Sequence, residues 1–161
     1  MKVIIAGYSK TGTKSICAAL KHFNYSVDDF PEHIDQRTEF WWRIYNAEPG
    51  DEIAQTPEIF KQMYSDVDVC TDTPAYLFWE QILEAFPDAK VILMERDSEE
   101  VWWKSLEKHF VRERKTNIGA WILEYLPRWY VRLLCDDLWK SQDRHRFFTW
   151  AGAVGPTEKR I

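Results

Sequence analysis

The sequence predicts an α/β fold with a central parallel sheet flanked by helices. Two short apolar runs, residues 2–6 (KVIIA) and 90–94 (KVILM), predict strands, and the first has the β-branched composition typical of a buried parallel strand. Between and after these runs, apolar residues recur every three to four positions, which is the helical period. Strands that alternate with helices predict a parallel sheet, because a helix supplies the crossover that each parallel connection needs.

The composition bounds what kind of protein this is. The chain has 161 residues, 45% of them apolar, which is enough for one domain to bury a core. Its formal charge of −5 argues against a nucleic-acid partner, which would need a basic surface. Three scattered cysteines without CxxC spacing indicate a reducing compartment, and no apolar run is long enough to span a membrane. We therefore expect a cytoplasmic protein.

The first helix is expected directly after the first strand. Residues 7–13 form a loop with two glycines, and apolar residues then recur at helical spacing from Ile16 to Phe23, which predicts a helix over about 13–23. Residues 31–64 are helical and aromatic in pattern, with Pro57 suited to the first turn of a helix. Neighbouring tryptophans lie about 100° apart on a helix, so one member of each pair (41–42 and 102–103) should pack inward and the other could line a cleft.

The second half continues the alternation. Residues 67–71 (VDVCT) are a strand candidate, and Pro74 should open a helix over 75–86. After the strand at 90–94, Ser98 is suited to cap a helix that runs through Phe110. A helical stripe over 118–133 should kink at Pro127, and residues 151–161 have no periodic apolar face. We therefore expect one domain over residues 1–150 and a flexible tail over 151–161.

The loop between the first strand and helix nearly matches the Walker A pattern GxxxxGK[ST]. Its sequence, residues 7–15, is GYSKTGTKS, so that Thr13 stands where an ATPase or kinase has its phosphate-binding lysine. A loop of this kind wraps backbone N–H groups around a phosphate at the positive end of the following helix. The alternative is a tight turn whose glycines only satisfy backbone geometry. The residues predicted to bind the anion are Lys10, Thr11, Gly12, Thr13, Lys14 and Ser15.

The stretch AGYSKTGTKSICAAL resembles the 5′-phosphosulfate loop of the P-loop sulfotransferases, particularly a compact branch with the loop G-x-x-[RK]-T-G-T-x-S. Two further matches follow in the expected order, TDTPAYLFWEQILEAFPDAKVIL and ERDSEEVWWKS, so the resemblance covers about residues 2–105. It implies a P-loop NTPase-like fold of three layers. It also implies sulfuryl transfer from 3′-phosphoadenosine 5′-phosphosulfate to a small hydroxyl or amine acceptor, without a metal.

By the same resemblance, Arg96 and Ser105 would hold the 3′-phosphate of the nucleotide. Arg96 follows the strand at 90–94 directly, at the edge where open α/β sheets bind ligands, and its planar fork suits a phosphate. Ser105 comes nine residues after Arg96 where the resemblance leads us to expect eight. The alternative for Arg96 is a salt bridge with a carboxylate at the start of the next helix.

Asp72 follows the strand candidate at 67–71, and the resemblance gives this aspartate the role of the base that deprotonates the acceptor. Lys10, helped by Thr13 and Lys14, would stabilise charge on the leaving phosphate. Two alternatives remain for Asp72. It could hold Mg²⁺ as in ATPases, or it could cap the helix that begins at Pro74.

Two other functions remain open at this point. One is a kinase or NTPase with a degenerate Walker loop, which magnesium dependence would reveal. The other is a non-catalytic, sulfotransferase-like nucleotide-binding protein. The family normally continues into a further strand and loop that help to hold the nucleotide, but only eleven residues follow Trp150. Either the fold is shortened at its C-terminal end, or the sequence is part of a longer chain.

Overall fold

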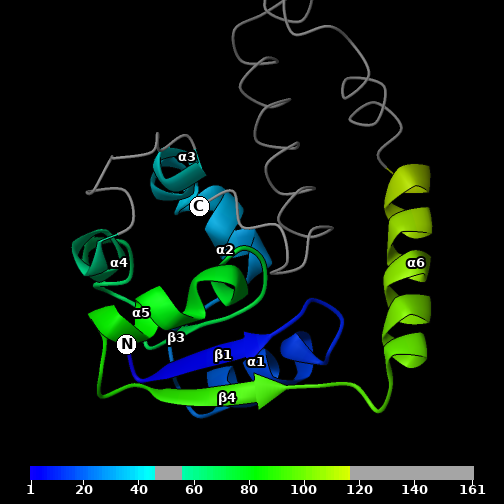
Figure 1. The fold of residues 1–161 in the computed structure, drawn as a ribbon, viewed down its shortest axis with the longest axis horizontal. Helices are drawn as coiled ribbons and strands as arrows, with labels where there is room; N and C mark the ends of the chain where they lie inside the picture. Colours follow the sequence, from blue (N-terminus) through cyan, green and yellow to red (C-terminus); the bar gives the residue numbers. More distant parts are fainter. Residues whose placement is uncertain (46–55, 117–161) are drawn as a thin grey trace, which may run out of the picture.

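The computed structural model describes residues 1–45 and 56–116, which form an α/β fold around a four-stranded parallel sheet (Figure 1). The strand order is β2-β3-β1-β4, so the first strand of the chain lies inside the sheet. All three pairings are parallel, as the alternation of strands and helices predicted. The strands are β1 (Val3–Gly7), β2 (Val27–Asp28), β3 (Val69–Cys70) and β4 (Lys90–Met94).

The helices follow the predicted order, although the helix predicted to end at Phe110 runs on to Thr116. The helix expected over 75–86 is split, because Leu77 N–H bonds the carbonyl of Pro74 and draws the first turn into 3₁₀ geometry. Strand β2 was not predicted, since two residues are too short to show an alternating pattern. The helical elements are α1 (Thr13–His22), α2 (Phe30–Asp35), α3 (Thr38–Tyr45), α4 (Pro57–Met63), the 3₁₀ turn η2 (Ala75–Phe78), α5 (Trp79–Ala85) and α6 (Glu99–Thr116).

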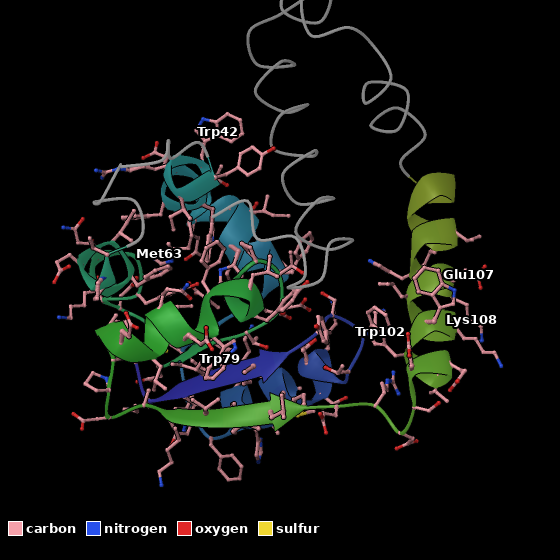
Figure 2. The ribbon with its side chains drawn as sticks, in the orientation of Figure 1. Trp42, Met63, Trp79, Trp102, Glu107 and Lys108 are labelled. Atoms are coloured by element: carbon pink, nitrogen blue, oxygen red, sulfur yellow. The ribbon has the colours of Figure 1, made fainter. Side chains whose placement is uncertain are left out.

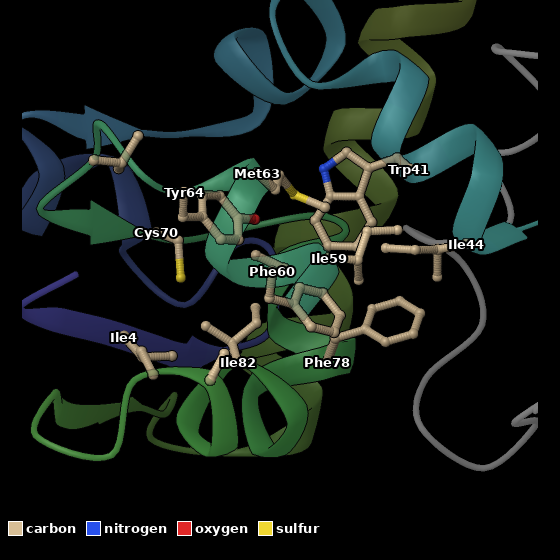
Figure 3. Close-up of a cluster of buried hydrophobic side chains, with 13 residues drawn as sticks. Ile4, Trp41, Ile44, Ile59, Phe60, Met63, Tyr64, Cys70, Phe78 and Ile82 are labelled. Carbon is tan, nitrogen blue, oxygen red and sulfur yellow. The ribbon is translucent and has the colours of Figure 1, made fainter. Parts of the chain in front are cut away.

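Successive side chains of β1 point to opposite faces of the sheet, and each face has its own core cluster. Val3 and Ile5 belong to a cluster with Cys17 of α1, while Ile4 belongs to a larger cluster with α3, α4 and α5. Figure 3 shows this larger cluster, in which Trp41 is fully buried. The three layers are therefore α1, the sheet, and the helices on the opposite face, which is the P-loop-like architecture that was predicted.

Strand β4 is an edge of the described sheet. Its residues Val91 and Leu93 are exposed, with 38% and 65% of their surface accessible. Within residues 1–45 and 56–116, the structure contains no helix that is long and apolar enough to cross a membrane. The helical stripe predicted over 118–133, its kink at Pro127 and the tail over 151–161 lie outside the described residues.

Candidate functional site

The loop between β1 and α1 forms at the carboxyl edge of the sheet, where β1, β3 and β4 all end. Gly12 precedes α1 with a φ of 107°, a left-handed conformation that glycine adopts without steric cost. No side chain caps α1, and its first turn contains no acidic residue. The first N–H groups of an α-helix have no partner within the helix, so this end of α1 presents donors and a positive dipole to the loop.

Two hydrogen bonds fix the shape of the loop. The buried Thr11 hydroxyl donates to the carbonyl of Tyr8 at 2.6 Å, which closes the turn. Arg96, which follows β4, donates from Nε to the carbonyl of Lys10 at 2.7 Å. Lys10 itself has a positive φ of 72°, which is uncommon for a residue with a side chain and occurs often at ligand sites. The loop is therefore held from both sides in a defined, locally strained conformation.

Asp72 lies against this loop, although the two are far apart in the sequence. Its carboxylate accepts hydrogen bonds from the hydroxyl of Ser9 and, at 3.0 Å, from the hydroxyl of Thr13. A third bond comes from the backbone N–H of Thr73 at 2.7 Å. Only 7% of Asp72 is exposed, and its φ of 61° is again left-handed. A carboxylate has about four acceptor positions, so the two oxygens retain room for one further donor.

The hydrogen bonds of this site bear on two alternatives that the sequence left open: that Asp72 caps a helix, and that Arg96 forms a salt bridge. The interpretation of Asp72 as a helix cap is wrong, because the 3₁₀ turn begins after Pro74 without a side-chain cap and the carboxylate bonds the loop instead. For Arg96, the described residues show a bond to the carbonyl of Lys10 and no ion pair with a carboxylate.

A second carboxylate, Asp29, lies near Asp72. It is 7% exposed and caps α2, where its side chain accepts from the N–H of Phe30 at 2.8 Å. Burial raises the pKa of Asp29, and the negative charge of Asp72 raises it further, whereas the positive charge of Lys14 lowers it. Lys14 therefore acts electrostatically on the carboxylate of Asp29.

A cleft of about 700 Å³ adjoins the loop. Its walls include the aromatic rings of Tyr8, Tyr76, Trp79 and Trp102, and Arg96 lies at the same cleft. Rings of this kind suit the flat organic part of a ligand. Burial raises the pKa of the Tyr76 hydroxyl, and the nearby charge of Asp72 adds to the shift. Tyr76 therefore lines the cleft and also lies near the carboxylate of Asp72.

The tryptophan pairs follow the prediction that one member packs inward. Trp41 is fully buried in the core, while the ring of Trp42 packs at a tilt against Tyr45, with the ring centroids 5.9 Å apart. On α6, Trp102 faces the loop (Figure 2) and its indole N–H donates to the carbonyl of Ser9 at 2.9 Å. Trp103 is 58% exposed, so in this pair the inward member is also the one that lines the cleft.

The remaining predicted residues lie at the margins of this arrangement. Lys14 and Ser15 are exposed in the first turn of α1. Ser105 is half-buried on α6, one turn after Trp102 and therefore on a similar face of the helix. Sequence reasoning missed Ser9, whose hydroxyl and carbonyl join Asp72 to Trp102. No motif marks this serine, and only the fold brings its partners together.

Comparisons with known proteins agree with this geometry. The profile of the sulfotransferase domain family matches residues 2–153. The chain is also similar to the Ava biosynthesis cluster protein M of Aspergillus versicolor, with 32% identity over 114 residues. This alignment covers 69% of the chain and 44% of the relative, so the chain spans less than half the length of that protein. The family match extends over nearly the whole sequence, and the chain belongs to the sulfotransferase domain family.

Proposed function

We propose that this protein transfers a sulfuryl group from 3′-phosphoadenosine 5′-phosphosulfate to a small hydroxyl or amine acceptor. The observation that carries the proposal is the contact between Asp72 and the loop, because it puts a carboxylate beside the expected anion site. Membership of the sulfotransferase domain family supports the same reaction class.

The donor set of the loop fits the phosphosulfate end of such a nucleotide. The amino end of α1 supplies N–H groups and a positive dipole, and no acidic side chain of its first turn competes with them. Lys10 adds a cation from within the loop, and Arg96 adds a planar guanidinium at the end of β4. We expect Arg96, with Ser105 on α6, to contact the 3′-phosphate.

The proposed reaction is an in-line displacement at sulfur. Asp72 takes the proton from the acceptor hydroxyl as the new oxygen–sulfur bond forms. The bond between sulfur and the bridging phosphate oxygen breaks, and the leaving phosphate keeps the electron pair. Lys10, Thr13 and the loop amides stabilise the negative charge that develops on this phosphate. The hydrogen bonds from Ser9 and Thr13 hold the carboxylate in place for the proton transfer.

Titration with adenosine 3′,5′-bisphosphate, the desulfated nucleotide, tests the proposed donor site. We expect it to bind without magnesium and, at one hundred times its Kd, to raise the free energy of unfolding by about 2.7 kcal/mol. Calorimetry and thermal unfolding in EDTA measure both effects. Transfer of labelled sulfate to a panel of phenols, alcohols and amines then tests the reaction. Failure of the nucleotide to bind in EDTA would refute the proposed donor site.

One contact favours a second candidate, a nucleotide kinase or NTPase. In P-loop NTPases a loop Ser or Thr and a strand-end Asp hold Mg²⁺ together, and Thr13 and Asp72 are hydrogen-bonded here at 3.0 Å. Thr13 itself occupies the position of the Walker lysine, which argues against this candidate. A thermal shift that appears only with ATP and magnesium would favour the kinase over the sulfotransferase.

A further inference from the structure

His33 of α2 is fully buried beneath the end of β3, where the mechanism described above assigns it no role. The capping box of Asp29 and Glu32 fixes the first turn of this short helix. The imidazole packs edge-on against Trp41 and Tyr64, with ring centroids 5.8 and 6.0 Å away. Both the helix and the ring are therefore held rigidly.

The imidazole makes one hydrogen bond in the described part of the chain, from Nε2 to the carbonyl of Thr71 at 2.9 Å. Burial lowers the pKa of His33, partly offset by the bond to Thr71 and by the charges of Asp28, Asp72 and Glu32. The ring is therefore neutral near pH 7. Since a carbonyl oxygen only accepts, Nε2 carries the proton and donates it.

Thr71 is the residue immediately before Asp72, and both of its backbone groups are held by neighbouring elements. Its N–H donates to the carbonyl of Asp28 at 3.1 Å, and its carbonyl receives the bond from His33. The carbonyl of Thr71 and the N–H of Asp72 belong to one planar peptide unit. A bond that fixes this carbonyl therefore also fixes the orientation of the peptide unit that leads into Asp72, whose backbone is left-handed.

We propose that His33 is a positioning residue, which orients Asp72 towards the loop through the carbonyl of Thr71. Without this bond, the peptide unit could rotate and the carboxylate would lose its alignment with Ser9 and Thr13. Strained backbone persists only where its surroundings hold it in place, and His33 is one such restraint. The inference rests on the proposed role of Asp72 as the base.

Three variants separate positioning from general stability. His33→Phe keeps a ring but removes the donor, His33→Gln keeps an N–H donor on a flexible side chain, and Tyr64→Phe alters the same cluster without touching Thr71. We expect His33→Phe to lower kcat about tenfold, the effect of one lost hydrogen bond on a fixed group, with little change in acceptor KM. His33→Gln should recover part of the rate, and Tyr64→Phe should leave it unchanged.

Amide hydrogen exchange supplies a readout that does not depend on turnover. His33→Phe should accelerate exchange at residues 71–73 relative to both wild type and Tyr64→Phe, measured at pH 7 without ligand. Wild-type exchange and rate in a folded His33→Phe protein would overturn the inference. If the wild-type protein transfers no sulfuryl group, the proposed function fails by itself, and the exchange comparison still decides whether His33 holds this segment.

Discussion

At the residue scale, Asp72 serves both the fold and the proposed chemistry with the same two oxygens. The hydrogen bonds from Ser9 and Thr13 tie the end of β3 to the loop, a third bond comes from the N–H of Thr73, and only 7% of Asp72 is exposed. A substitution of Asp72 can therefore change both the stability of the protein and the rate of the reaction, and an experiment must separate these two effects. The choice of substitution therefore decides what an experiment on this residue can show.

Asp72→Asn is the substitution that separates the two effects. The amide retains one oxygen acceptor for the loop hydroxyls but cannot take a proton, so we expect an intact fold, near wild-type affinity for adenosine 3′,5′-bisphosphate, and a transfer rate lowered about a hundredfold or more. Asp72→Ala should lose nucleotide affinity and stability as well, because Ser9 and Thr13 then lose their acceptor. Calorimetry and single-turnover rates measure these effects. An Asp72→Asn protein as fast as wild type would remove this residue from the mechanism.

The sequence was informative about the loop and less so about its surroundings. The spacing of Gly7, Gly12 and Lys10 is local, so the loop and its left-handed glycine could be expected from the residues alone. The Asp72 contacts join residues about sixty positions apart, and they became visible only in the fold. The resemblance to sulfotransferases had singled out this aspartate, whereas Ser9 and His33 lack a motif and were missed.

At the element scale, β1 and β4 lie close together beside the loop. Gly7 pairs with Met94, and a Cβ built on Gly7 would lie 2.6 Å from Met94 Cβ and 2.8 Å from its carbonyl oxygen. Both are far below van der Waals contact. The glycine at this position therefore permits strand packing in addition to starting the loop, a role that the Walker-like pattern alone does not reveal.

Gly7→Ala should therefore destabilise the protein by about 1–3 kcal/mol, the usual effect of overpacking. Gly12→Ala is the matched comparison, because its added methyl group would meet Met94 Cε at 3.4 Å but must adopt a φ of 107°. Its expected effect is about 1–2 kcal/mol from backbone strain, together with weaker nucleotide binding. Urea unfolding curves measure the free energies. Unchanged stability of the Gly7→Ala protein would contradict the close packing of β1 on β4.

The strands were predicted at nearly the right residues, since β1 and β4 each present an unbroken apolar run. β2 and the 3₁₀ turn η2 could not be predicted with equal success. β2 is only two residues long, and η2 starts with backbone hydrogen bonds to the carbonyls of Asp72 and Pro74, where Asp72 is itself held by long-range contacts with Ser9 and Thr13. Short elements of this kind owe their structure to neighbours rather than to their own composition.

At the scale of the whole molecule, α6 and the segment that joins it to β4 both contact the loop. Arg96 of the connecting segment donates to the carbonyl of Lys10, and the indole of Trp102 on α6 donates to the carbonyl of Ser9. The ring of Trp102 also packs against Tyr8, with centroids 5.7 Å apart. Because Ser9 in turn bonds Asp72, the contacts run continuously from α6 through the loop to the end of β3.

This continuity predicts that a change on α6 affects ligand binding at the loop. Trp102→Phe keeps an aromatic ring but removes the donor to Ser9, and we expect the affinity for adenosine 3′,5′-bisphosphate to fall about fivefold to tenfold, as for one lost hydrogen bond. Trp103→Phe is the matched control, because the ring of Trp103 is 58% exposed and makes no described contact with the loop. Isothermal titration of both variants measures the difference. Equal affinities would mean that the loop keeps its shape without α6, and that β1, β3 and α1 suffice to form the anion site.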